Sequence, residues 1–220
     1  MKGLNSKKLK IEMIHDIVCS WCPIGYNNIM SAIKKSNIDV EFHFLPYELN
    51  PFMGEQGESI VSYFSRQMNW NERKLHDYQQ SLVTTASKAG VIIDFSKRTH
   101  YYSTRSAHLL MHWAAQFNKQ LALNECLINA YFKNGQDISN LTILLNIAEE
   151  LGFDRQKTKT ALTSKQLNQE LDEKVSRVKV LNLSSIPAFI INETTLISGS
   201  NSVGYFEGIL SEFSNESLSA

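Results

Sequence analysis

The sequence predicts an α/β fold in which one sheet is built from the two ends of the chain. Strand-like segments occur in the order strand, helix, strand near the start and strand, strand, helix near the end. The long middle of the chain shows only helical periodicity. With 220 residues, of which 43% are hydrophobic, the chain can bury a sizeable core. We therefore expect a βαβ unit over 1–57, an all-helical insertion over 58–183 and a ββα unit over 184–220.

The first unit begins with a strand from Lys10 to Val18, a segment rich in Ile, Met and Val. A helix should follow from Cys19. Pro23 then falls in its first turn, where the missing N–H costs nothing. A second strand is expected from Asp39 to Leu45, and the proline that follows should end it. The three elements together predict a right-handed βαβ unit.

The middle of the chain carries helix signals and no convincing strand. The apolar residues between Leu141 and Leu151 recur at the spacing of one buried helix face. Cap residues and glycines mark the helix ends. The expected helices are Glu72–Lys88 with Asn71 as cap and Gly90 at its end, Ser103–Phe117, Ala122–Lys133, Asn140–Leu151 between the cap Ser139 and Gly152, and Asp154–Val180 with a break near Ser164.

The strand signal returns near the C-terminal end. The segments Ala188–Ile191 and Thr194–Ile197 flank a turn at Asn192-Glu193, which predicts a hairpin. Ser202 should cap a last helix through Phe213, and we expect the polar tail from Asn215 onward to be unstructured.

The overall composition indicates a protein without nucleic-acid or membrane partners. Its formal net charge is zero and its pI is about 7.0, so no charge excess attracts an anionic polymer or surface. No segment approaches the roughly 18 apolar residues of a membrane-spanning helix. Three cysteines are too few for a disulfide framework in a chain of this size. We expect a cytoplasmic protein.

The motif Cys19-Ser20-Trp21-Cys22 lies where the first strand should meet the first helix. Two thiols at this spacing can close a small disulfide ring, and a helix N-terminus lowers the pKa of the first thiol. Cys19 is therefore the expected nucleophile, and Cys22 is placed to resolve a mixed disulfide. A Cys-x-x-Cys beside a βαβ pattern indicates a thioredoxin-like redox site.

Two other interpretations of these cysteines are a zinc half-site and a pair of inert core thiols. A structural zinc site needs four ligands, and Cys126 lies on an apolar helix face that suits a buried position. His108 and His112 are spaced for metal binding, but packing or a surface role is favoured without a carboxylate pattern nearby. We expect no metal. Asp16 either caps the helix entry or lies in solvent, or else it accepts the proton of Cys22 through water.

A proline stands directly before the returning strand, in Ser184-Ser185-Ile186-Pro187-Ala188-Phe189. Because only about 5–6% of X-Pro bonds in folded proteins are cis, local sequence alone predicts a trans proline that starts a strand.

Five stretches along the chain match the pattern of one known family, and the first and last are the most specific. The stretches are Asp16–Gly25, Leu45–Pro51, Ser103–His108, Ala130–Ile138 and Ile186–Phe189 with Ser198-Gly199. Taken together, they resemble the DsbA family, and within it the FrnE-like branch related to 2-hydroxychromene-2-carboxylate isomerases and kappa-class glutathione transferases.

The resemblance implies that Pro187 is cis and packs against the Cys-x-x-Cys motif, while the backbone of Ile186 contacts the substrate. It also implies a substrate site that includes Ser20, a partly exposed Trp21 and His108, covered by the helical insertion. Family members usually carry Pro-Trp between the cysteines, where this chain has Ser20 and Trp21. The change alters which N–H groups face Cys19, so the family's redox potential does not carry over.

The sequence thus predicts a thiol-disulfide oxidoreductase that acts on protein or peptide thiols and disulfides. No metal or nucleotide is needed, and glutathione or a reductase would restore the pair. A glutathione-dependent isomerase or transferase is the alternative, although the chromene-carboxylate relatives place Ser where Cys19 stands. A non-catalytic, chaperone-like module that binds through the cleft near Trp21 is a third hypothesis, and its binding would survive loss of both thiols. The protein would be a monomer or a homodimer.

Overall fold

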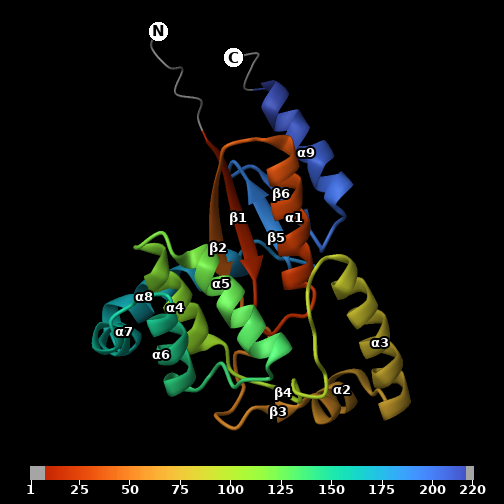
Figure 1. Cartoon of the computed structure of the whole chain (residues 1–220), viewed down its shortest axis with the longest axis vertical. Helices are drawn as coiled ribbons and strands as arrows, with labels where there is room; N and C mark the ends of the chain where they lie inside the picture. The colour runs from red at the N-terminus through yellow and green to blue at the C-terminus, as the bar shows by residue number, and fades with distance from the viewer. Residues whose placement is uncertain (1–7, 217–220) are drawn as a thin grey trace.

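The computed structural model describes residues 8–216 and contains a four-stranded mixed sheet in the order β2-β1-β5-β6 (Figure 1). The central strand β1 (Leu9–His15) pairs in parallel with β2 (Val40–Pro46) and antiparallel with β5 (Ala188–Ile191). A short hairpin joins β5 to the edge strand β6 (Thr195–Ser198). The prediction that both ends of the chain contribute to one sheet is confirmed.

The register of the sheet brings the cysteine motif and Pro187 to the same end of the two central strands. Ile14, near the end of β1, lies opposite Ala188, the first residue of β5. The chain therefore leaves β1 toward the cysteines where Pro187 enters β5. Two segments far apart in the sequence therefore meet at this end of the sheet.

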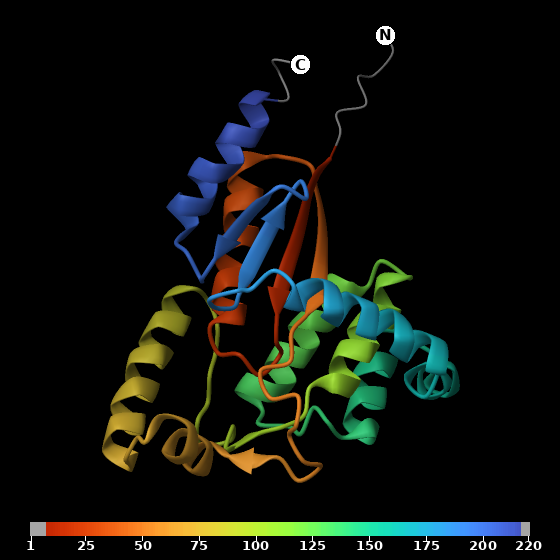
Figure 2. The ribbon, with the colours of Figure 1, turned by 180° about the vertical axis from the view of Figure 1, so that it is seen from behind.

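Helices cover both faces of the sheet. The helices α1 (Cys22–Ser36) and α9 (Val203–Glu216) pack on one face, where the β1 side chains Ile11 and Met13 join the main core (Figure 1). The C-terminal half of α8 (Lys165–Lys179) packs on the other face, with Val178 in a small cluster around Ile14 (Figure 2).

A bidentate ion pair fixes α8 to this second face. Both guanidinium nitrogens Nη1 and Nη2 of Arg177 donate to the carboxylate of Glu12, at 2.8 and 2.6 Å. Glu12 is buried within β1, so the pair supplies the partner that a buried charge requires.

The middle of the chain is helical, and it lies below the sheet in two groups (Figures 1 and 2). The antiparallel pair of β3 (Glu58–Ser59) and β4 (His100–Tyr101) corrects the prediction of a segment without strands; each strand has two residues, too few for a sequence pattern to reveal. Among the described residues, no helix has the length and hydrophobicity to cross a membrane. The elements are β3 (Glu58–Ser59), α2 (Ile60–Met68), α3 (Glu72–Lys88), β4 (His100–Tyr101), α4 (Arg105–Ala115), α5 (Gln120–Ile128), a π-helix η1 (Asn129–Lys133), α6 (Leu141–Glu150) and α7 (Arg155–Leu162).

Most predicted helix caps are confirmed, and one is wrong. The side chain of Asn71 accepts from the amide of Lys74 at the start of α3, and Ser164 caps α8 as the predicted break requires. The cap of α6 is Asn140 rather than Ser139, because the Asn140 side chain accepts from two amides while the Ser139 hydroxyl donates to Asp137.

The C-terminal end differs from the prediction in a second way. Helix α9 continues through Glu216, so Asn215 belongs to the helix and not to an unstructured tail. The remainder of the predicted tail, 217–220, lies outside the described residues.

Candidate active site

The loop between β1 and α1 carries the first cysteine in front of the helix rather than inside it. The amide of Cys19 donates to the Asp16 carbonyl, and the amide of Cys22 donates to the Cys19 carbonyl, both at 3.1 Å. These bonds form turns, and α1 starts only at Cys22 with Pro23 in its first turn. The prediction that the helix starts at Cys19 is wrong by almost one turn. Cys19 therefore faces the N-terminus of α1.

The two thiols lie side by side, and both are free. Cys19 is 7% exposed and Cys22 is 2% exposed. A hydrogen bond from the Cys22 thiol lowers the pKa of Cys19 despite its burial, with help from the amides of Trp21 and Cys22. Burial, followed by this same hydrogen bond, raises the pKa of Cys22 well above its usual range. The pair thus concentrates negative charge on Cys19, the thiol nearer to solvent.

Pro187 lies across from the nucleophile candidate. The Ile186–Pro187 peptide bond is cis, whereas local sequence alone favoured trans. The Cys19 Sγ lies 3.8 Å from the carbonyl oxygen of Ile186. Gly25 in α1 permits this approach, since a Cβ atom there would lie 2.7 Å from the Cγ of Pro187. The geometry therefore brings Cys19, Ile186 and Pro187 together.

The other residues expected at the substrate site differ in accessibility. Trp21 is 37% exposed, and it partly offsets the burial that raises the pKa of Tyr78 on α3. Ile186 is half-buried, while Ser20 and His108 are buried. Trp21 and Ile186 are thus the members of this set that a substrate can reach directly.

Asp16 lies fully buried behind the cysteines and does not cap α1. Its Oδ2 accepts from the amide of Leu49 at 2.7 Å. The Nε2 of His108 lies 3.4 Å from Asp16 Oδ1 and 3.1 Å from the carbonyl oxygen of Tyr47. The expectation of a capping or solvated Asp16 is wrong, because its carboxylate anchors the segment that follows β2.

Sequence reasoning missed Arg98, a buried arginine beside the cysteine motif. It is 2% exposed, and its Nη2 donates to the carbonyl of Val18 at 3.2 Å. Among residues 8–216 it forms no ion pair with a carboxylate. Two of the aromatic residues that surround Arg98 lie close to it in sequence, and they are the one local signal for its position. The other two come from a distant segment. Four ring centroids lie 4.8–5.4 Å from the guanidinium carbon: Phe95, Tyr101, Tyr131 and Phe132.

The structure also places the residues considered for metal binding. His112 pairs with Glu170 at 3.0 Å, and Cys126 is a half-buried free thiol on α5. Within the described part of the chain, no group of three or more His, Cys, Asp or Glu residues could hold a metal ion.

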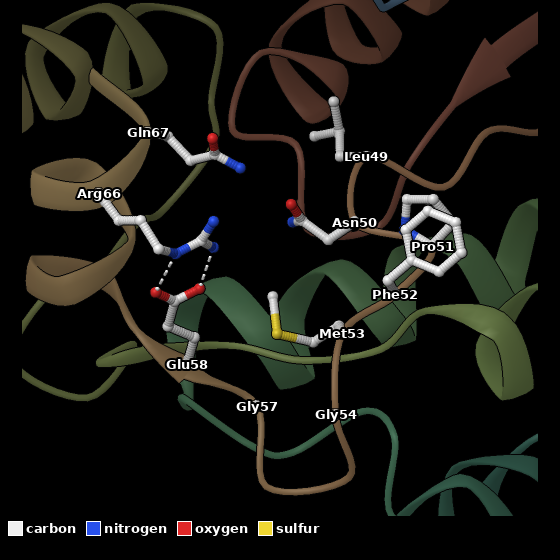
Figure 3. Close-up of a pocket in the computed structure, with 10 residues that line it drawn as sticks. All are labelled: Leu49, Asn50, Pro51, Phe52, Met53, Gly54, Gly57, Glu58, Arg66 and Gln67. Atoms are coloured by element: carbon white, nitrogen blue, oxygen red, sulfur yellow. Dashed lines mark hydrogen bonds and ion pairs between the residues drawn. The ribbon is translucent and has the colours of Figure 1, made fainter.

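A hollow of about 620 Å³ opens between the segment after β2 and helix α2 (Figure 3). The ion pair between Arg66 and Glu58, at 2.6 Å, lies along one wall, and the fully exposed Phe52 lies near the rim. Leu49 lines the hollow and also donates its amide to Asp16, so the hollow is connected directly to the active-site loop.

A sheet of this topology, with a Cys-x-x-Cys motif after its central strand β1 and a cis proline across from the motif, defines a thioredoxin-like protein. The comparison with family models agrees. Residues 10–211 match the DSBA-like thioredoxin domain, and the chain belongs to this family.

Individual relatives support the same fold. The chain is 29% identical to the uncharacterized protein YwbO of Bacillus subtilis, over 92% of this chain and 96% of that protein. The probable DsbA oxidoreductase SCO1869 of Streptomyces coelicolor superimposes with a TM-score of 0.85 at 19% identity, covering 93% and 89% of the two chains.

Two further structures represent different activities on this fold. A 2-hydroxychromene-2-carboxylate isomerase has a TM-score of 0.68 at 12% identity, with 96% and 98% of the chains covered. The cytosolic disulfide reductase DsbM of Pseudomonas aeruginosa, solved with GSH, has a TM-score of 0.63 at 14% identity, with 94% and 99% covered. The expected relations to the DsbA family and to 2-hydroxychromene-2-carboxylate isomerases are confirmed, the second at the level of fold.

Proposed function

We propose that this protein exchanges thiols and disulfides with protein or peptide substrates through Cys19 and Cys22. The observation that carries the proposal is the position of the Cys19 sulfur, 3.8 Å from the carbonyl oxygen of Ile186 and beside the cis peptide bond to Pro187. The lowered pKa of Cys19 and the raised pKa of Cys22 favour a thiolate at Cys19 and a thiol at Cys22, the states that a nucleophile and a resolving thiol require.

In the reducing direction, the Cys19 thiolate attacks one sulfur of a substrate disulfide. The substrate S–S bond breaks, a mixed disulfide forms, and the departing thiolate takes up a proton. Cys22 then loses its proton and attacks Cys19, which releases the second substrate thiol. The substrate gains two electrons and the pair becomes a disulfide; substrate oxidation is the reverse.

The surroundings of Cys19 favour a peptide substrate. The carbonyl of Ile186 is close enough to Cys19 to pair with the backbone of an extended segment that carries the reacting sulfur. Trp21 offers exposed aromatic surface, and the hollow beside Leu49 has room for neighbouring residues (Figure 3). We propose that Trp21 and Ile186 contact the substrate directly, and that the buried Pro187, Ser20 and His108 support the substrate site from behind.

The proposal includes glutathione as a reductant or small substrate in a cytoplasmic setting. The similar protein DsbM, which was solved with GSH and is named a cytosolic disulfide reductase, supports this part. The pair itself carries the electrons, so no further cofactor enters the cycle.

Two single substitutions test the assignment. Cys19→Ser should abolish insulin reduction and dithiol oxidation, because no attacking thiolate remains. Cys22→Ser should accumulate a mixed disulfide between Cys19 and substrate or glutathione, detectable by mass. If both variants keep full activity, the redox proposal is refuted.

A glutathione-dependent isomerase is the second candidate, favoured by the fold shared with the chromene-carboxylate isomerase. Isomerisation needs no electron transfer, so it should survive in Cys22→Ser. The same variant therefore separates the two candidates when it is assayed with a chromene carboxylate and glutathione.

A further inference from the structure

The least explained buried charge in the described structure is Arg98. Its guanidinium is enclosed by four aromatic rings, and it donates to the Val18 carbonyl, one residue before Cys19. A buried cation without a carboxylate partner is costly, and cation–π contacts recover only part of that cost. The hydroxyls of Tyr101 and Tyr131 also stabilise the charged form of Arg98, and a nearby anion would stabilise it further.

Two groups that can carry negative charge, Cys19 and Asp16, lie on either side of Val18 in the loop that Arg98 contacts. Val18 is bonded to Cys19, so covalent geometry limits the distance from Arg98 Nη2 to the Cys19 sulfur to roughly 9 Å. Tyr78 interacts electrostatically with both Arg98 and Cys19, and Tyr131 does so with both Arg98 and Asp16. Arg98, Cys19 and Asp16 therefore share tyrosine neighbours in one buried electrostatic network.

The groups around Cys19 act in opposite directions. Cys22 and the amide N–H groups of the motif stabilise its thiolate, whereas Asp16 repels it. Tyr78 from α3 faces the same region, as do Tyr101 of β4 and Tyr131 of η1 around Arg98. Arg98 is the one fixed cation that this set contains in the described structure.

We propose that Arg98 is a positioning residue for the redox pair: caged beneath the motif, it holds the Val18 carbonyl and supplies the positive charge that stabilises the Cys19 thiolate. The inference rests on the proposed function only for its consequence in exchange, because thiolate formation is measurable without any substrate. Stabilising the thiolate stabilises the reduced pair and so makes its disulfide the stronger oxidant.

The test compares Arg98→Met with the wild-type protein by following thiolate absorbance in the ultraviolet against pH. Coulomb's law at about 8 Å and an effective dielectric constant of about 20 gives an expected rise of about 1.5 in the pKa of Cys19. In a glutathione buffer at a pH above the raised pKa of Cys19, the equilibrium of the pair should shift about 30-fold toward its disulfide, which corresponds to about 45 mV.

Two further variants separate charge from structure. Arg98→Lys keeps the charge, so its Cys19 pKa should stay near the wild-type value even though the bidentate shape is lost. Arg177→Met removes an arginine of the Glu12 pair on the far face of the sheet, and it should lower stability without changing the Cys19 pKa.

If Arg98→Met does not fold, citrulline at position 98 removes the charge while nearly preserving the shape of the side chain. An unchanged Cys19 pKa in the neutral variant would overturn the inference, as would an equal rise in Arg98→Lys. A protein that shows the predicted pKa changes but exchanges no disulfides would refute the proposed function and leave this inference standing.

Discussion

The close approach of Pro187 to Gly25 in helix α1 predicts the effect of Gly25→Ala. The new Cβ would lie 2.7 Å from Pro187 Cγ and 3.3 Å from Ser200 Cα, whereas carbon atoms normally pack at about 3.5–4.0 Å. The loop with Pro187 must therefore move by about 1 Å. Overpacking costs about 1–3 kcal/mol, and the better helix propensity of alanine offsets about 1 kcal/mol.

We expect Gly25→Ala to lose up to about 2 kcal/mol of unfolding free energy in urea. We also expect it to lose about 100-fold in kcat/KM for disulfide reduction, because a displacement of this size separates reacting groups. Gly208→Ala is the matched control: it lies within α9, and nothing lies within 4 Å of its added Cβ. Gly208→Ala should gain about 1 kcal/mol of unfolding free energy and leave kcat/KM for disulfide reduction unchanged. If both variants gain stability and keep their rate, the inferred role of Gly25 is wrong.

Two further predictions concern stability. Burial, with repulsion from His108, holds the pKa of His15 well below its usual 6.5, so the unfolded chain binds a proton that the folded chain excludes. The wild-type protein should therefore lose up to about 1.4 kcal/mol of unfolding free energy per pH unit below pH 6.5. In urea unfolding, His15→Phe should make the unfolding free energy less dependent on pH in this range. An unchanged pH dependence would contradict the assignment. Asn140→Ala should cost about 1 kcal/mol in thermal or urea unfolding because it removes the α6 cap, and an equal loss in Ser139→Ala would show that the cap is misassigned.

The order of the elements was predictable from local patterns, because strands and helices differ in apolar spacing. The hairpin from β5 to β6 is one example: its turn residues Asn192 and Glu193 both adopt positive φ, as a tight hairpin turn requires. The start of α1 was not predictable in the same way. The turns at Asp16 and Cys19 depend on backbone hydrogen bonds that compete with the helix, and the sequence does not show which of them forms.

The candidate site was predictable where its chemistry is local. Cys19 and Cys22 are close in sequence, so their spacing alone indicated a redox pair. Arg98 joins the site only through tertiary contacts with Val18 and with rings near position 131, which no local pattern contains. Asp16 likewise finds its partner in Leu49, on a segment whose path depends on the whole fold.

The division of the sheet between the two ends of the chain has a consequence during synthesis. Cys19 and Ile186, which face each other, are separated by 167 positions. A ribosome releases the cysteines long before the strand that completes their surroundings, and until then β1 lacks its neighbour β5. The candidate site consequently forms only in the finished polypeptide, and nascent chains carry the two cysteines without β5 and the Ile186–Pro187 segment beside them.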